Sequence, residues 1–164
     1  MGRAPVKEDR ASSVFVFKVA LKGQKGIWRR IAIRGDQTLA DLHDAIFDAF
    51  DRFDEHLYSF YFFRPGTKGR DRLRDALQFA HPACLDDQGP LGFEPRLRNA
   101  AKTRIDSLKL SEGKEFEYLF DFGDSWWHVL TTESTTSESD EQPFPRVIES
   151  KGKSPPQYPD NDED

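Results

Sequence analysis

The sequence predicts one α+β domain, in which a mixed or antiparallel sheet packs against one main amphipathic helix and carries a helical or loop insertion. Three observations support this fold class. Apolar and polar residues alternate at the period of strands in several short runs, and residues 38–52 repeat apolar side chains at the spacing of one helix face. The chain has 164 residues, the length of one domain, and its 14 Phe, 4 Tyr and 3 Trp predict an aromatic core.

Two runs of β-branched and aromatic residues near the start of the chain predict a first hairpin. They cover residues 14–21 and 27–33, and Gly23 and Gly26 lie between them. The residues before this hairpin, 1–13, are charged and lack an apolar run. We therefore expect a flexible N-terminus followed by the folded domain.

Residues 38–52 predict the main helix. Leu39, Leu42 and Ile46 share one face, and Thr38 is placed to accept a hydrogen bond from an amide of the first turn. The opposite face carries an acidic stripe made of Asp41, Asp44, Asp48 and Asp51. Such a stripe repels nucleic acid.

The middle of the chain predicts less regular structure. Residues 56–63 predict a strand, and turn-forming residues then begin an insertion over residues 64–104. Within it, residues 70–80 predict a short helix, whereas repeated Pro and Gly predict irregular structure up to about residue 98. Residues 105–110 predict a brief strand or turn.

A second hairpin is predicted over residues 115–132, which hold the densest set of chemically active side chains. Aromatic residues alternate along its first strand, a turn follows, and an apolar run resumes. If Asp124 and Ser125 form a two-residue loop, His128 faces Asp121 across the hairpin. A shift of one residue would separate them.

The C-terminal part of the chain is acidic and rich in proline. The folded domain is expected to cover residues 14–148, and residues 149–164 are expected to form a mobile tail, because so few apolar residues cannot offset the entropy of ordering. The net charge of −5 is uneven, since acidic residues predominate over 137–164 and basic residues over 64–104.

Cysteine use and hydropathy bear on the compartment. The one cysteine, Cys84, excludes an internal disulfide and a cysteine-based metal cluster, which favours a reducing environment. No segment approaches the roughly 20 apolar residues that span a bilayer, and the N-terminus lacks the apolar part of a signal peptide. We expect a cytoplasmic protein without membrane contact.

A set of motifs spread over residues 14–160 recurs in one known family. The motifs are Ile27-Trp28-Arg29-Arg30-Ile31, Thr38-Leu39, Leu42-His43, His56-Leu57, Phe60, Phe116, Tyr118, Phe120-Asp121-Phe122-Gly123-Asp124, Trp126, His128, Phe144-Pro145 and Pro155-Pro156-Gln157-Tyr158-Pro159-Asp160. On these residues the chain resembles the plasmid pRiA4b Orf-3-like proteins, and it departs from their pattern at Trp127 and in the loosely constrained segment 64–104. The resemblance implies an α+β domain of bacteria or archaea, found also as a passenger of some bacterial transposable elements. It implies no established activity and no assigned catalytic residues.

Five residues are candidates for catalysis or metal binding, because imidazoles and carboxylates transfer protons and bind zinc, iron or manganese. They are His43, His56, Asp121, Asp124 and His128, and the three histidines are the candidate metal ligands. Their spacing alone does not bring them together, so a structural pairing of His with Asp is the preferred interpretation. No cofactor is predicted, and the sequence lacks a glycine-rich phosphate loop, a dinucleotide fingerprint and a nucleophile elbow.

A second group of residues is a candidate for binding a partner. Trp28, Trp126 and Trp127, together with Arg29 and Arg30, combine rings and cations as surfaces for single-stranded nucleic acid do. The better nucleic-acid candidates within 64–104 are Arg70, Arg72, Arg74, Arg96 and Arg98. Interleaved acidic residues oppose that interpretation, and core packing explains most of the tryptophans.

Three functional hypotheses follow. The first is a non-enzymatic binding or accessory module with a protein partner, connected with plasmid or transposable-element biology, whose surface lies on the insertion and around residues 121–128. The second is a small metal-dependent hydrolase that uses the five His and Asp candidates. The third is a nucleic-acid-binding protein that uses segment 64–104. The missing catalytic motifs favour the first, and the sequence predicts no oligomeric state.

Overall fold

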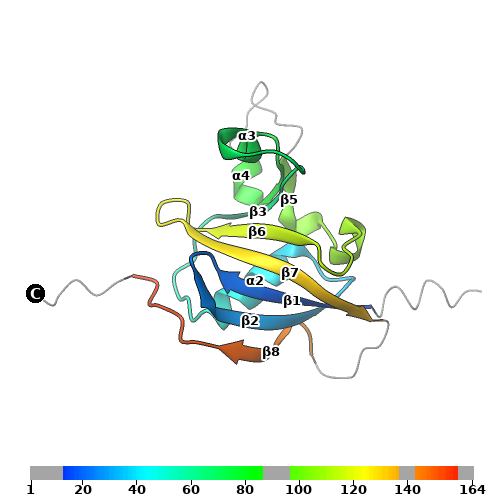
Figure 1. Cartoon of the computed structure of the whole chain (residues 1–164), viewed down its shortest axis with the longest axis vertical. Helices are drawn as coiled ribbons and strands as arrows, with labels where there is room; N and C mark the ends of the chain where they lie inside the picture. Colours follow the sequence, from blue (N-terminus) through cyan, green and yellow to red (C-terminus); the bar gives the residue numbers. More distant parts are fainter. Residues whose placement is uncertain (1–12, 87–96, 137–142, 159–164) are drawn as a thin grey trace, which may run out of the picture.

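A computed structural model describes residues 13–86, 97–136 and 143–158, which form one domain built on a large sheet (Figure 1). The strands are β1 (Val14–Leu21), β2 (Gln24–Arg34), β3 (Tyr58–Phe62), β4 (Leu77–Ala80), β5 (Leu97–Asn99), β6 (Glu115–Phe120), β7 (Trp126–Thr136) and β8 (Arg146–Lys151). The sheet has eight strands in the order β5-β4-β3-β6-β7-β1-β2-β8. Its pairs are antiparallel apart from β4 with β5, which are parallel, so the prediction of one domain with a mixed sheet is confirmed.

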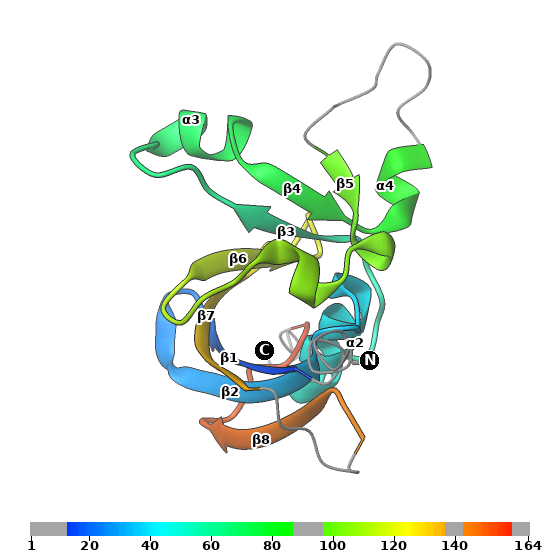
Figure 2. The same cartoon turned by 90° about the vertical axis from the view of Figure 1, so that its right-hand side faces the viewer.

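The helical part of the chain is small. It consists of α2 (Leu39–Ala49), α3 (Gly69–Arg74), α4 (Pro82–Asp86) and the 3-10 helices η1 (Ala100–Lys102) and η2 (Ile105–Leu108). Figure 2 shows β6, β7, β1 and β2 curving around α2, so the sheet encloses this helix. The expected single main amphipathic helix is therefore not confirmed, because the structure is mostly sheet and shares its helical residues among several short segments.

Helix α2 begins and ends where local chemistry requires it. The Thr38 hydroxyl accepts the Asp41 N–H, and the Asp41 carboxylate accepts the Thr38 N–H, which satisfies two amides of the first turn. The helix ends at Ala49, before the predicted residue 52, because Asp51 has a left-handed φ of 57°. The helix buries Leu39, Leu42, His43 and Ile46 against the sheet.

The core is aromatic, as the composition predicts. Rings from three strands pack on the apolar face of α2, and burial of each large side chain is worth about 1.5–3 kcal/mol. The fully buried rings include Phe17, Phe60, Tyr118 and Phe120. Because Tyr118 and Phe120 end in this core just before the second hairpin turns, they position the polar residues that follow.

The segment 64–104 differs from the predicted insertion. Residues 77–80, predicted as part of a helix, form β4, which pairs with β3 through Phe60 and Phe79. Phe79 and Ala80 are buried, so packing against the core overrides the local helix preference. The segment thus adds β4 and β5 to the sheet, and residues 87–96 lie outside the described part of the chain.

Residues 149–158, which the sequence predicts as part of a mobile tail, lie against the domain in the structure. Strand β8 pairs with β2 at the sheet edge, and Ser154 and Gln157 are buried. The Ser154 hydroxyl donates to the Phe50 carbonyl, and the Gln157 amide oxygen accepts the N–H groups of Phe53 and Asp54. Polar side chains therefore dock this segment, which a criterion based on apolar content overlooks. Residues 159–164 lie outside the described part.

Gly152 is required where the chain leaves β8. Its φ is 79°, and a Cβ atom there would lie 2.8 Å from the Gly26 carbonyl oxygen. We expect Gly152→Ala to lower the free energy of unfolding by more than ~1 kcal/mol, measured by urea denaturation. Gly23 is the matched control, because it has a φ of 84° but nothing within 4 Å. Equal losses in the two variants would contradict the predicted backbone clash.

None of the helices within residues 13–86, 97–136 and 143–158 combines the length and apolar character that a membrane crossing requires.

Candidate functional site

The turn between β6 and β7 is longer than the predicted two-residue loop. The strands pair Phe120 with Trp126 and Tyr118 with His128, so residues 121–125 form the turn. His128 therefore faces Tyr118, and the expected pairing of His128 with Asp121 is wrong. The reason is register, which the turn length sets and which strand periodicity does not reveal.

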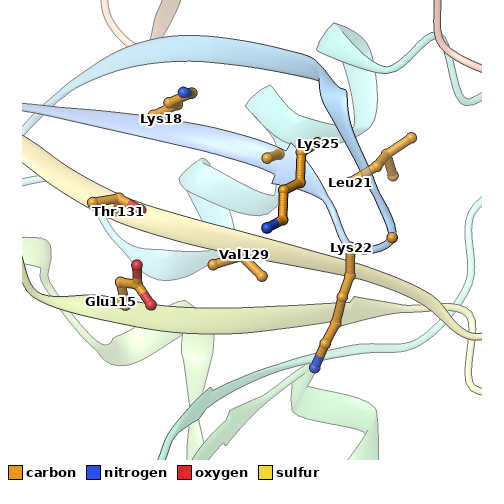
Figure 3. Close-up of a pocket in the computed structure, with 9 residues that line it drawn as sticks. Lys18, Leu21, Lys22, Lys25, Glu115, Val129 and Thr131 are labelled. Carbon is orange, nitrogen blue, oxygen red and sulfur yellow. The ribbon is translucent and has the colours of Figure 1, made fainter.

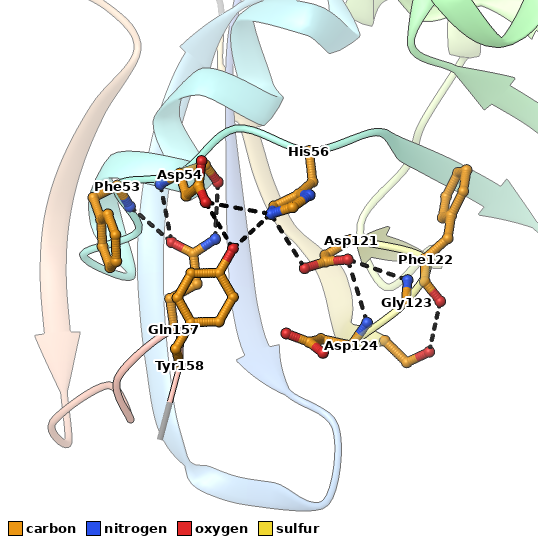
Figure 4. Close-up of polar contacts among 10 residues, drawn as sticks. Phe53, Asp54, His56, Asp121, Phe122, Gly123, Asp124, Gln157 and Tyr158 are labelled. Carbon is orange, nitrogen blue, oxygen red and sulfur yellow. Dashed lines mark hydrogen bonds and ion pairs between the residues drawn. The ribbon is translucent and has the colours of Figure 1, made fainter. Parts of the chain in front are cut away.

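Asp121 organises this turn. Its backbone is left-handed, with φ of 67°, and its Oδ1 accepts the N–H groups of Gly123 at 3.1 Å and Asp124 at 3.3 Å (Figure 4). Its carbonyl oxygen accepts the Ser125 N–H at 2.6 Å. Aspartate favours such turns because its short carboxylate satisfies nearby amides. One oxygen of this buried carboxylate is thus used structurally.

The other oxygen of Asp121 faces His56, which precedes β3. The His56 Nε2 lies 3.5 Å from Asp121 Oδ2 and 2.7 Å from the Tyr158 hydroxyl (Figure 4). That hydroxyl donates to Asp54 Oδ2 at 2.8 Å, so the His56 Nε2–H donates to the phenol oxygen. The hydrogen bond to Asp54 raises the pKa of Tyr158 to about 12. Four residues from three segments of the chain are therefore tied together.

His128 lies inside the core. Its Nε2 is 3.3 Å from the Arg52 Nη2, and its Nδ1 is 3.4 Å from the Tyr118 carbonyl oxygen. A guanidinium only donates, so Nε2 carries the lone pair and the Nδ1–H points at the carbonyl. Burial and the charge of Arg52 lower the pKa of His128 to about 3. This histidine is neutral at physiological pH.

Arg52 is a functional-looking residue that sequence reasoning missed. Its side chain is buried, with the guanidinium carbon 4.6 Å from the ring centre of Trp126 and 5.4 Å from that of Phe120. Burial lowers the pKa of Arg52 to about 10. Within the described residues, the Arg52 Nε and the Trp126 Nε1 have no acceptor. An arginine just after a helix carries no pattern that would signal this environment.

His43 contacts Tyr118, as His128 does, but it contacts the Tyr118 hydroxyl and His128 contacts the backbone carbonyl. The His43 Nδ1 is 2.6 Å from the Tyr118 hydroxyl, and its Nε2 is 3.2 Å from Glu55 Oε1. The imidazole stacks on Tyr58 with ring centres 3.9 Å apart. Burial lowers the pKa of His43 to about 3. The five candidates thus divide into a group at the β6–β7 turn, where the buried Asp121 lies near His56 and Asp124, and two buried histidines on Tyr118.

The tryptophan candidates are largely occupied by neighbours. Trp28 lies under the Arg30 guanidinium, and Arg30 also forms ion pairs with Glu133 and Glu149. Trp126 packs against the main core, and Trp127 packs against Tyr61 at 5.3 Å between ring centres. These contacts support packing of the tryptophans against their neighbours. They do not support open ring faces on which nucleic-acid bases could stack.

The basic candidates of segment 64–104 are partly neutralised. Arg72 stacks on Phe63 and forms an ion pair with Glu117 at 2.8 Å. Arg74 forms ion pairs with Asp71 at 2.9 Å and Asp75 at 3.2 Å. Arg70 is exposed, Arg98 lies in β5, and Arg96 lies outside the described residues. These arginines therefore do not present the uniform positive face that phosphate binding favours.

A depression of about 410 Å³ lies on the face of β1, β6 and β7 that points away from the core (Figure 3). Lys18, Lys22 and Lys25 line it together with Glu115. Lys22 forms an ion pair with Glu117 at 3.0 Å, and the Lys18 Nζ lies 5.0 Å from the ring centre of Trp28. Two of its three lysines, Lys18 and Lys22, are thus held by neighbouring groups.

Comparison with known proteins identifies the family. A family model described as plasmid pRiA4b ORF-3-like protein matches residues 13–158. The chain belongs to this family. It is 29% identical over 148 residues to the uncharacterized protein y4hQ of Sinorhizobium fredii, a match that covers 89% of this chain and 66% of that protein, just under two thirds of its length.

A solved structure shares the fold of this pRiA4b ORF-3-like chain. It is the crystal structure of MM3350, a protein of unknown function from Methanosarcina mazei, with a TM-score of 0.65 and 24% sequence identity. The match covers 88% of this chain and 72% of that one. The likeness establishes the fold, and function must be argued from the side chains.

Proposed function

We propose that this pRiA4b ORF-3-like protein is a non-enzymatic binding module that docks a basic, apolar protein segment beside the β6–β7 turn. The observation that carries the proposal is a group of four exposed apolar side chains, hereafter the Phe53 surface. Its members are Phe53, Leu57, Phe122 and Tyr158, exposed to 71%, 38%, 41% and 41%. Figure 4 shows Phe53 and Tyr158 at one end of a polar network and Phe122 at its other end. Exposed apolar side chains on one side of a protein mark interaction sites.

The Phe53 surface is held in place before any partner binds. The rings of Phe53 and Tyr158 meet edge to face at 5.8 Å, and the Phe53 N–H donates to Gln157. The Leu57 carbonyl accepts the Asp121 N–H at 2.9 Å, which joins this surface to the turn. Side chains that are already ordered lose little entropy on binding, so they contribute more to affinity.

The charge around the Phe53 surface selects a basic partner. The exposed carboxylates here are those of Asp51, Asp54, Glu55 and Asp124. Among the nearby cations, Arg52 is buried, and Lys22, which lines a hollow with Asp124, forms an ion pair with Glu117. His56 is bonded to Tyr158. The exposed charge is therefore negative, which attracts Lys and Arg and repels phosphate. This supports a protein partner over nucleic acid.

Binding is favoured over catalysis by the way the polar groups are used. Asp121 holds turn amides, and His128 is fully buried against Arg52. A general base must reach a substrate proton, which a fully buried imidazole does not do. The metal-dependent hydrolase built on the five candidates therefore has less support than the binding module.

Calorimetry with defined peptides tests the proposal. The probes are a 12-residue amphipathic peptide of Lys and Leu and its counterpart of Glu and Leu. We expect the basic peptide to bind more weakly as salt rises, and the double variant Phe53→Ser, Phe122→Ser to lose at least about tenfold in affinity. The matched control is Leu73→Ser, since Leu73 is 46% exposed on α3, away from the Phe53 surface.

Three results would contradict the proposal. They are equal binding of the acidic peptide, an equal loss in the Leu73→Ser variant, and no basic peptide binding at low salt. The link to plasmid or transposable-element biology stays a prediction, to be checked by identifying the partner that the wild type, but not the double variant, retains in its native host.

A further inference from the structure

A buried imidazole and two exposed carboxylates converge where α2 faces the loop before β3. We propose that His43, Asp44 and Glu55 bind a divalent first-row transition metal ion, with zinc as the best match. Their ligand atoms all lie within 4.8 Å of one another. The His43 Nε2 is 3.2 Å from Glu55 Oε1 and 3.9 Å from Asp44 Oδ1. Zinc bonds of roughly 2.0–2.2 Å in a tetrahedron separate ligands by roughly 3.3–3.6 Å, close to these spacings.

The imidazole of His43 is already oriented for this role. It stacks on Tyr58 with an interplanar angle of 7°, and the fully buried Tyr118 holds its Nδ1 at 2.6 Å. A metal-binding histidine ordinarily gives its other ring N–H to a fixed acceptor, which sets the ring orientation. In the metal-free protein the His43 Nε2–H donates to the Glu55 carboxylate and Nδ1 accepts the Tyr118 hydroxyl. A metal ion bound at Nε2 would take the place of that proton, and the Tyr118 oxygen is placed to accept an Nδ1–H instead.

The two carboxylates complete a site that is open on one side. The side chains of Asp44 and Glu55 are 71% and 62% exposed, so an ion there keeps coordination positions for water. Asp44 lies between Asp41 and Asp48 on the same helix, so negative charge is crowded around the site. A bound cation would offset part of this charge.

The proposed site differs from the metal set expected from the sequence. The Nε2 of His56 is bonded to Tyr158, and the Nε2 of His128 faces the cationic Arg52. Within the described residues, His43, Asp44 and Glu55 form the group of His, Cys, Asp and Glu ligands close enough for one ion. A nitrogen with two oxygens suits zinc, manganese or iron better than calcium or magnesium. This site shares one carboxylate, Glu55, with the charged surroundings of the Phe53 surface but none of its four apolar side chains.

Calorimetric titration of the metal-free full chain with zinc chloride tests the site. We expect one equivalent to bind, and Asp44→Asn and Glu55→Gln each to weaken binding by at least about tenfold. Asp48→Asn is the matched control. Asp48 is exposed one turn along α2, so this substitution removes the same charge without removing a ligand atom. These exposed substitutions should leave the metal-free melting temperature nearly unchanged.

Nitrogen NMR of the histidine rings gives a second readout. Zinc should shift the Nε2 resonance of His43 and leave that of His128 in place. The proposal is overturned by any of three results: no one-equivalent binding, an Asp48→Asn loss as large as that of Glu55→Gln, or a shift confined to the other histidines. All are measured without peptide, so their outcome is separate from that of the binding module.

Discussion

Replacing Phe120 by alanine should lower the free energy of unfolding by about 3–5 kcal/mol. Phe120 is fully buried and joins the core to the candidate sites. Its ring lies 5.8 Å from that of Phe47, 5.8 Å from that of His56 and 5.4 Å from the Arg52 guanidinium carbon. Removing the Phe120 ring leaves a cavity between α2 and the curved sheet, which these elements cannot close by moving together. Urea denaturation of the purified variant measures the loss.

Phe122→Ala is the matched control for this prediction. Phe122 lies two residues further along the same chain segment but is 41% exposed. Its removal should change the free energy of unfolding by no more than about 0.5 kcal/mol. If both variants lose similar stability, burial of Phe120 does not determine how much this end of the core contributes to the free energy of unfolding.

Lowering the pH from 7 to 5 should destabilise the protein by about 2 kcal/mol through His128 alone. Its pKa is about 3 in the folded protein, because it is buried beside Arg52, and the ordinary value of about 6.5 applies after unfolding. Between those values the unfolded chain binds a proton that the folded protein does not. Stability is therefore complete above about pH 6.5 and falls as the pH is lowered toward about 3.

Urea denaturation at a series of pH values measures this slope, and His128→Gln tests its source. Glutamine still offers an acceptor to Arg52 and a donor to the Tyr118 carbonyl, so the variant should fold and show a shallower slope. His43, with a pKa lowered to about 3 by burial, adds a slope of the same sign in metal-free protein. A folded-state NMR titration of His128 near pH 6.5 would contradict the prediction.

Local patterns predicted the elements that local chemistry controls. Thr38 and Asp41 form the capping box that begins α2, and the first hairpin pairs 14–21 with the run that follows Gly26. Both depend on interactions among residues close in sequence, which a single chain displays directly. The composition also predicted the aromatic core, because burying large rings removes the most apolar surface from water and so stabilises the fold most.

The short strands at the two ends of the sheet, β5 with β4 and β8, were missed because they carry little periodic signal. β4, β5 and β8 have only four, three and six residues, and they form where an existing sheet edge offers unpaired backbone groups. Gln157 docks the C-terminal segment through a hydrogen bond to a residue 104 positions earlier, Phe53. Nothing near Gln157 in the sequence indicates that partner.

The sequence by itself determined family membership, an aromatic single domain, the main hairpins and the start of α2. Only the tertiary structure decided which partner each histidine meets: Tyr158 and Asp121 for His56, Arg52 for His128, and Tyr118 with Glu55 for His43. The physical reason is the distance along the sequence between the residues that meet. Periodicity reports which face a residue occupies, whereas a site needs atoms from distant segments to meet, and strand register and turn length set those meetings.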